Sequence, residues 1–430
     1  MKKIKSLLFI LSAVLLLSSC GYEPVFYGIM NDVPPEKATI SGNINSIARY
    51  TTGGEEFLFL CGNGKLKYKN ISSNKHGEWK TYSDLPFEIH YYNDIPTSST
   101  PEGHIGQQIL QVASDSDYVY LLTVSYRTNT EAGTTEPKKF YLWAKKFTLQ
   151  TGSTTKLNNR KTDSNEWINI TDSKESVYFP TGYNKNDLGY EFYFHIFSSN
   201  SPKTAHRKSY IRVSAPDSDA KYYELNGTSA PEEITLTNVV HSPDYNPEDK
   251  NNNIDSAFYI GDTLYFADTF AVTTNENFSQ NATYAYFIAE NKNHNLTNEI
   301  CYYKGTGEPV VFLKTGNTAA SIAATADSLI IGEGSYTSYY TSNGGIKKVL
   351  LNSDGSPDNK TTEFLNNAKY QFTNSHLVMT VICADPSKKE GEAIIYTGVT
   401  FKGSGSNGSA IFDDIGLWSY YPTRGNWNRE

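Results

Sequence analysis

The chain has 430 residues, with 38 Lys and Arg against 46 Asp and Glu, a net charge of −8, and 38% hydrophobic residues. This acidic balance argues against nucleic-acid binding and against electrostatic adhesion to anionic lipid. The length exceeds the roughly 250 to 300 residues at which a single core stops growing, so we expect several cores or one repeated unit.

The first 20 residues have the pattern of a secretory signal. Three lysines precede an apolar run from Leu7 to Leu17, which is shorter than the roughly 20 residues needed to cross a bilayer. The run ends in Leu17-Ser18-Ser19-Cys20, which resembles the lipobox of bacterial lipoproteins. This resemblance implies that residues 1–19 are a signal peptide that is removed. Cys20 would then carry diacylglycerol on its thiol and a further acyl chain, such as palmitate, on its new amino group. An ordinary signal peptide, with Cys20 left as a spare thiol, is the alternative.

Residues 20–37 contain three prolines and little periodic pattern, so they are expected to be a lipidated N-terminus and tether. Gly21 follows the lipidated cysteine, where an aspartate would signal retention in the inner membrane of enterobacterial-type cells. The resemblance therefore implies an exported protein, anchored in the bilayer of the outer membrane through Cys20.

Residues 38–430 have the composition of a strand-rich domain. The full chain has 32 tyrosines and 21 phenylalanines against three methionines, and aromatic residues are typical of strands. We expect little helix. The best helical candidate, Ala319 to Ala326, is short and interrupted by polar residues, so it is interpreted as a buried strand.

One pattern recurs at a period of about 64 residues: a small or acidic turn followed by three to five apolar or tyrosine residues. The apolar parts of its six copies are Phe57–Leu60, Tyr118–Leu122, Val177–Phe179, Leu264–Phe266, Leu329–Ile331 and Leu377–Val381. Further strand-like runs on either side bring each unit to about four strands, which is typical of a β-propeller blade.

The sequence therefore predicts an all-β chain that forms a β-propeller of six four-stranded blades. The number becomes seven if Phe87–Tyr92 or Tyr210–Leu225 belongs to a blade without the recurring pattern. We expect Ala38–Ile44 to complete the last blade, because closing the ring removes an unpaired edge. Serial β-sandwich domains are the alternative fold.

Three cysteines remain after Cys20, and each lies in an apolar run. An exported chain can form disulfides, and Cys61, Cys301 and Cys383 permit at most one. We interpret them as buried and unpaired.

No catalytic, cofactor-binding or metal-binding residues are predicted. The sequence contains no GxSxG, HExxH, Walker A or Rossmann glycine pattern, and its eight histidines do not fall at metal-ligand spacing. Asp249–Asp255 begins like a calcium loop, but Ile254 occupies the glycine position. Asp354–Asp358 is interpreted as a solvated turn.

These features indicate a membrane-anchored, non-catalytic binding or scaffolding module displayed at the cell envelope. Its partner would be a protein or a glycan. Paired tyrosines such as Tyr302-Tyr303 could line the mouth of the ring for stacking, but packing between blades is favoured. The alternatives are a periplasm-facing helper, resembling the propeller lipoprotein of outer-membrane barrel assembly, and a glycan-active propeller enzyme.

Overall fold

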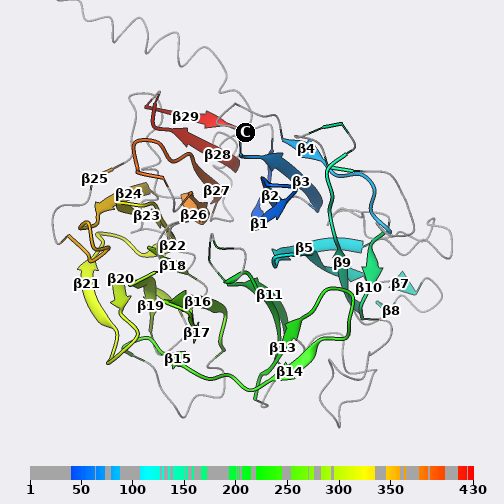
Figure 1. Cartoon of the computed structure of the whole chain (residues 1–430), viewed down its shortest axis with the longest axis horizontal. Helices are drawn as coiled ribbons and strands as arrows, with labels where there is room; N and C mark the ends of the chain where they lie inside the picture. Colours follow the sequence, from blue (N-terminus) through cyan, green and yellow to red (C-terminus); the bar gives the residue numbers. More distant parts are fainter. Residues whose placement is uncertain are drawn as a thin grey trace, which may run out of the picture. The chain divides into compact units, whose positions relative to one another are not determined.

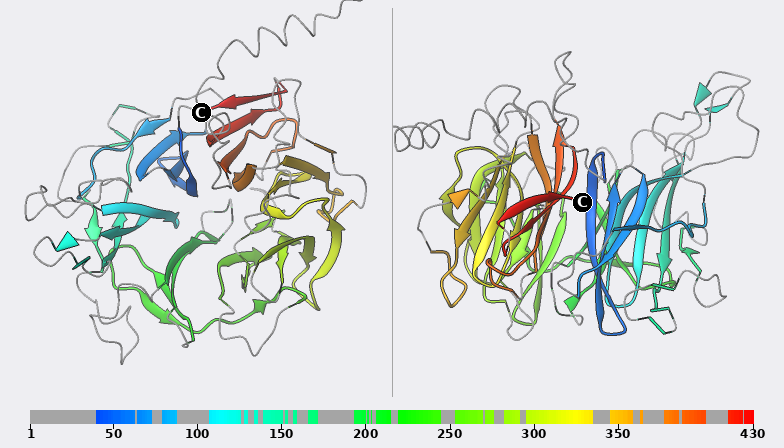
Figure 2. Two further views of the ribbon diagram at one scale, coloured as in Figure 1. Left: turned by 180° about the vertical axis from the view of Figure 1, so that it is seen from behind. Right: turned by 90° about the horizontal axis from the view of Figure 1, so that it is seen from above.

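Seven small sheets, each built from consecutive stretches of the chain, follow one another around a ring (Figures 1 and 2). This computed structural model describes residues 40–430, which belong to one compact unit, Ala38–Glu430. The description excludes residues 63, 73–78, 88–106, 126–127, 130–133, 136–138, 151, 154–156, 159–165, 172–192, 200, 202, 204–205, 215–218, 245–252, 270, 276–281, 292–294, 335–344, 359–362, 365–376, 386–387, 402–414 and 424.

Blades 1 to 3 each have four strands. Blade 1 contains β1 (Ile44–Thr52), β2 (Glu55–Gly62), β3 (Lys65–Asn70) and β4 (Lys80–Thr81). Blade 2 contains β5 (Gln107–Ser114), β6 (Val119–Ser125), β9 (Lys139–Lys145) and β10 (Ile168–Asn169), and a small hairpin of β7 (Thr128–Asn129) and β8 (Thr134–Thr135) is inserted in it. Blade 3 contains β11 (Tyr193–Ser198), β12 (Ser209–Ser214), β13 (Lys221–Leu225) and β14 (Glu232–Ile234).

Blades 4 to 7 follow in the same way. Blade 4 has three strands in the described residues: β16 (Ser256–Ile260), β17 (Thr263–Ala267) and the parallel β15 (Val239–Val240). Blade 5 contains β18 (Val272–Thr274), β19 (Ala285–Glu290), β20 (Leu296–Tyr303) and β21 (Val310–Lys314). Blade 6 contains β22 (Ala319–Ala324), β23 (Ser328–Glu333), β24 (Gly345–Leu350) and β25 (Glu363–Phe364). Blade 7 contains β26 (Leu377–Cys383), β27 (Ile395–Phe401), β28 (Gly416–Tyr421) and β29 (Asn426–Arg429).

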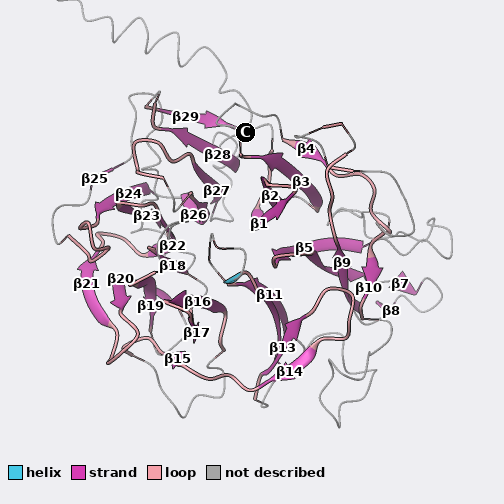
Figure 3. Cartoon of the chain, viewed as in Figure 1, coloured by secondary structure: helices cyan, strands magenta, loops and turns pink. Residues whose placement is uncertain are grey.

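The innermost strands of the seven blades contact one another in chain order, and β26 of the last blade contacts β1 of the first. The chain is therefore a seven-bladed β-propeller, and the all-β prediction is confirmed. No α-helix occurs among the described residues, and the short segment coloured as helix in Figure 3 is a 3₁₀ turn at His206, between β11 and β12. Within the same residues, no helix has the length and apolar character needed to span a membrane.

The predicted count of six blades is wrong, because counting copies of the recurring pattern does not count blades. The described copies fall on blades 1, 2, 4, 6 and 7, and neither blade 5 nor blade 3 carries one. In blade 3, β12 and β13 coincide with Tyr210–Leu225, the segment considered for a seventh blade. Arg212 interrupts the apolar run of β12, yet its side chain is only 4% exposed because it pairs with Asp255 of blade 4. The other segment considered, Phe87–Tyr92, lies outside the described residues beyond Phe87. The alternative of serial β-sandwiches is also wrong.

The recurring pattern marks mostly the second strand of a blade. Four copies fall on β2, β6, β17 and β23, whereas Leu377–Val381 falls on the innermost strand β26. The copy at Val177–Phe179 lies outside the described residues. Ala319–Ala326 is a strand as predicted, because its first six residues form β22 and are all buried.

The ring closes differently from the prediction for Ala38–Ile44. Blade 7 takes all four strands from the end of the chain, and the N-terminal segment adds only a short connection. The backbone N–H of Ile40 donates to the carbonyl of Glu430 at 2.7 Å, and Ser41 forms an isolated bridge with Gly416. Ile44 itself begins β1 of blade 1.

The hydrophobic cores lie within and between neighbouring blades. Tyr265 of blade 4 and Tyr303 of blade 5 meet edge to face, with 5.6 Å between their ring centroids, so these tyrosines pack between blades. Cys61, Cys301 and Cys383 are all unpaired. The first two are buried as predicted, whereas Cys383 is half-buried.

Candidate functional site

The candidate site is a cavity in the middle of the ring, with a volume of about 580 Å³. The innermost strands of all seven blades contribute residues to its wall. No tyrosine is among the described lining residues, so the paired tyrosines do not form a stacking surface there. The lining mixes short polar side chains with alanine, valine and isoleucine.

Most of the small polar side chains in this wall connect neighbouring blades. Ser46 accepts a hydrogen bond from the N–H of Val112, Thr273 accepts one from Ala324, and Ser321 donates to the carbonyl of Met379. Gln111, Ser198 and Thr380 make equivalent connections to Ile196, Ser114 and Ile44. These groups therefore satisfy backbone groups of the adjacent innermost strands.

A chain of polar side chains crosses the wall from blade 2 to blade 4. Gln111 Nε2 lies 2.8 Å from His195 Nδ1, and His195 Nε2 lies 3.9 Å from Asp255 Oδ1. Arg212 Nη1 donates to the same carboxylate oxygen from behind the wall. Burial lowers the pKa of His195, against the opposing effect of Asp255. Asp255 is the one carboxylate among the described lining residues.

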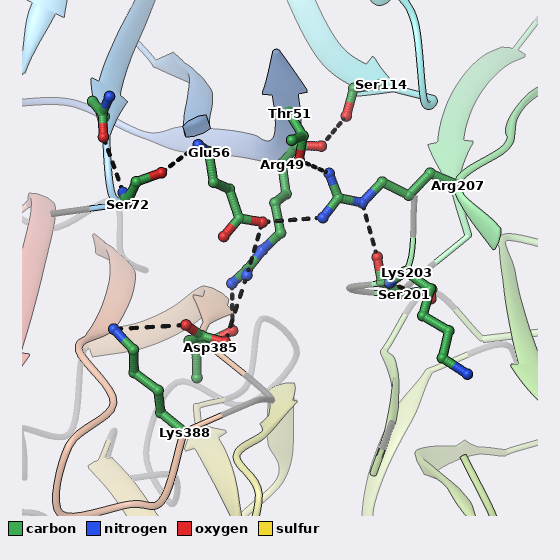
Figure 4. A network of polar contacts seen from close by, with 12 residues as sticks. Arg49, Thr51, Glu56, Ser72, Ser114, Ser201, Lys203, Arg207, Asp385 and Lys388 are labelled. Carbon is green, nitrogen blue, oxygen red and sulfur yellow. Dashed lines mark hydrogen bonds and ion pairs between the residues drawn. The ribbon is translucent and has the colours of Figure 1, made fainter. Parts of the chain in front are cut away.

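A second network of polar contacts lies where the innermost strands end (Figure 4). Arg49 near the end of β1 and Arg207 in the β11–β12 connection both donate to Glu56 Oε1, at 3.2 and 3.0 Å. Arg207 also donates to Thr51 Oγ1 at 2.6 Å, and Arg49 donates to the carbonyl of Ala384 at 2.8 Å. The network therefore ties blades 1, 3 and 7 together across one end of the cavity.

The β11–β12 connection, Ser199–Lys208, is held from the opposite side as well. The His206 ring stacks on Tyr259 of blade 4, with centroids 4.1 Å apart and planes at 7°. Arg207 is only 3% exposed, and it lines the cavity together with Ser199 and Ser201. The described residues of this connection therefore line one end of the cavity, which we call its floor.

Burial shifts the pKa of two further groups near the wall. Burial raises the pKa of the Cys383 thiol, although the neighbouring Arg49 opposes this. Burial, together with the charges of Asp255 and Asp268, raises the pKa of Glu290 to about 8. Glu290 is 7% exposed and does not line the cavity.

The predicted site residue, Cys20, lies outside the described residues. Of the loop Asp249–Asp255, residues 253–255 are described, and Asp255 belongs to the cavity wall. At the turn Asp354–Asp358, Asp354 accepts hydrogen bonds from the N–H and hydroxyl of Ser356, as expected for a turn. No group of three or more potential metal ligands occurs in the described part of the chain.

Sequence reasoning missed all the polar residues of the cavity. Gln111, His195 and Asp255 come from three blades and are separated by more than 50 residues along the chain. A weak signal exists, since a polar residue followed by Ile or Val and then Ala recurs at Ser46, Gln111 and Ser321 on innermost strands. It becomes informative only after the innermost strands are known.

No family model matches the chain, and no curated protein is similar to it in sequence. Among solved structures, it is similar to an α-L-arabinanase mutant of Cellvibrio cellulosa, with 11% identity, a TM-score of 0.33, and coverage of 89% of this chain and 92% of the arabinanase. It is also similar to AofleA of Arthrobotrys oligospora, with 10% identity, a TM-score of 0.38, and coverage of 92% and 87%. The fungal lectin of Aleuria aurantia, described as a six-bladed β-propeller with a novel fucose recognition mode, has 9% identity, a TM-score of 0.35, and coverage of 92% and 96%. The assignment of the seven-bladed fold rests on the strand order of this chain.

Proposed function

We propose that this chain is an exported, lipid-anchored binding or scaffolding module whose central cavity takes up a polar ligand without changing it chemically. The signal sequence and Cys20 support the anchor. The cavity supports the binding role, because its volume of about 580 Å³ falls within the roughly 300 to 1,000 Å³ of ligand pockets. Its wall is formed by strands, which hold side chains more rigidly than loops do.

The composition of the wall favours binding over glycoside hydrolysis. Hydrolysis of a glycosidic bond ordinarily uses two carboxyl groups on either side of the bond. Asp255 is the one carboxylate among the described lining residues, and Arg212 already pairs with it. The remaining polar groups of the wall are amides, hydroxyls, guanidinium groups and one imidazole, which bind and orient a ligand.

A thermal-shift screen of the full chain tests this function. The protein is purified in a detergent without sugar head groups and screened against neutral saccharides, sugar acids and short peptides. A ligand at about 100 times its dissociation constant stabilises the folded protein by about 2.7 kcal/mol. We expect at least one compound to raise the melting temperature.

Two tryptophan variants locate the binding. Asn45 lines the cavity and is exposed at a β-bulge of β1, so Asn45→Trp narrows the cavity without entering the core. Ile168→Trp is the matched control, because Ile168 is 45% exposed on the outermost strand β10. The shift should disappear in Asn45→Trp and persist in Ile168→Trp. If no compound raises the melting temperature, or if the increase persists in Asn45→Trp, cavity binding is refuted.

A further inference from the structure

The orientation of the Gln111 amide is fixed by its neighbours. Its Oε1 accepts a hydrogen bond from the backbone N–H of Ile196 at 2.9 Å. The reversed amide would place an NH₂ group against this N–H, so that two donors would face each other. Gln111 Nε2 is therefore the donor that lies 2.8 Å from His195 Nδ1.

This orientation determines the protonation of His195. A nitrogen that accepts a hydrogen bond carries no proton, so Nδ1 is bare and the ring proton is on Nε2. The imidazolium form would direct a second N–H at the Gln111 amide. The lowered pKa caused by burial agrees with a neutral ring. Phe197 stacks on the imidazole at 5.8 Å and 22°, which also fixes the plane of the ring.

The Nε2–H of His195 and the carboxylate of Asp255 form a donor and acceptor pair in the cavity wall. The 3.9 Å between Nε2 and Oδ1 is too long for a direct hydrogen bond. One oxygen atom can nevertheless bond both atoms at ordinary lengths of about 2.7 to 3.0 Å.

We infer that His195 and Asp255 recognise a hydroxyl group of a neutral, hydroxyl-rich ligand such as a saccharide. This inference rests on the proposed binding function and specifies its ligand class. A hydroxyl accepts from Nε2–H and donates to the carboxylate, so it satisfies both groups at once. A carboxylate has no proton to donate to Asp255, and an ammonium group cannot accept from Nε2–H. Apolar neighbours in the wall, such as Val112 and Ile196, suit the C–H surfaces of a sugar ring.

The protonation state is tested on the full chain without a ligand. Long-range ¹H–¹⁵N correlation spectra of ¹⁵N-histidine-labelled protein distinguish Nε2–H from Nδ1–H, and the His195→Phe variant identifies the signals. We expect Nε2–H at pH 7. A proton on Nδ1, or an imidazolium at this pH, would overturn the assignment of the donor and with it the inference.

The ligand class is tested by titrating neutral saccharides, their sugar-acid counterparts and amino sugars against the full chain. His195→Phe keeps an aromatic ring beside Phe197 and removes the donor, whereas Asp255→Asn keeps the shape of the acceptor side chain. Each should weaken binding of a neutral saccharide at least tenfold. His241→Ala is the matched control, because His241 forms a similar pair with Asp268, at 3.3 Å, outside the cavity lining. It should change the affinity less than twofold.

The outcomes separate this inference from the proposed function. The inference is overturned if every ligand of the cavity is charged. It is also overturned if a neutral saccharide binds to His195→Phe and to Asp255→Asn with the same affinity as to wild type. Either result leaves cavity binding intact. If no ligand loses affinity in Asn45→Trp, both the inference and the proposed cavity binding are overturned. Circular dichroism and melting temperature confirm that each variant is folded before its affinity is compared.

Discussion

Lys69 extends from β3 of blade 1 toward blade 7, and 2% of its side chain is exposed. Its ammonium lies 2.9 Å from Glu430 Oε2 and near the rings of Trp79 and Tyr396, at 5.7 and 5.2 Å. Removing one partner of a buried ion pair leaves an uncompensated charge and costs about 3 to 5 kcal/mol. We therefore expect Lys69→Met to lower the free energy of unfolding by this amount in urea denaturation.

The pair Lys146–Asp117 provides the control for Lys69. The distance between Lys146 Nζ and Asp117 Oδ1, 2.5 Å, is shorter than the distance between Lys69 and Glu430, but the two side chains are 52% and 54% exposed. Exposed pairs contribute about 0 to 1 kcal/mol, so Lys146→Met should have little effect. If both variants lose the same free energy of unfolding, burial is not the reason that the Lys69 pair stabilises the fold. Combining Lys69→Met with Glu430→Gln should recover part of the loss, because the second change removes the unpaired carboxylate.

Glu290 makes the stability depend on pH. Its pKa is about 8 in the folded protein, against an ordinary value of 4.5. Between these values the folded protein keeps a proton that the unfolded chain releases, so this group lowers the free energy of unfolding as pH rises from 4.5 to 8. The slope is at most roughly 1.4 kcal/mol per pH unit.

The variant Glu290→Gln keeps the neutral shape at every pH. Urea denaturation between pH 5 and 10 should show wild type losing stability relative to this variant as pH rises, with the difference levelling off above about pH 9, where Glu290 is deprotonated in both states. Glu232→Gln, on the exposed part of β14, should run parallel to wild type. Parallel curves for wild type and Glu290→Gln would show that Glu290 does not titrate in this range.

At the scale of the strands, β-bulges explain why the cavity wall was not visible in the sequence. The register of the innermost strand shifts at Ile44/Ser46, Ile109/Gln111, Ala319/Ser321 and Met379/Val381. A bulge inserts one residue and redirects the side chains beside it. Alternating patterns identify regular strands such as β2, but they do not predict that Gln111 faces blade 3. The strands were therefore predictable, and the direction of their polar side chains was not.

The β11–β12 connection should loosen when its guanidinium is removed. Arg207→Met deletes the hydrogen bonds to Glu56 and Thr51 that hold this connection to blade 1. Hydrogen–deuterium exchange should then speed up at least tenfold at the amides of Ser199 and His206, which are hydrogen-bonded within the connection. Lys208→Met is the matched control, since Lys208 is 40% exposed and pairs with Glu224 of its own blade. Unchanged exchange in Arg207→Met would show that the floor is held by other contacts.

At the scale of the molecule, repetition made the ring predictable, but it did not give the number of blades. The propeller follows from short strands and polar turns that recur along the chain, because each sheet buries its faces against its neighbours. Blades 3 and 5 carry no copy of the recurring pattern. In blade 3, Arg212 interrupts the second strand, and the partner that makes its burial possible, Asp255, is 43 residues away. The cavity has the same origin, since its wall exists only when seven strands distant in sequence meet.

Anchoring the whole propeller to a membrane is expected to depend on one atom, the sulfur of Cys20. Bacteria grown with labelled palmitate should incorporate the label into wild type and into Cys61→Ala, in which a buried thiol is lost, but not into Cys20→Ala. Wild type should sediment with the outer membrane, whereas Gly21→Asp should move it to the inner membrane in an enterobacterial host. Two acyl attachments hold a protein on a bilayer far more firmly than one, so loss of Cys20 should release it. Label on Cys20→Ala, or unlabelled wild type, would contradict the lipid anchor. Label on wild type with Gly21→Asp still in the outer membrane would contradict only the sorting rule.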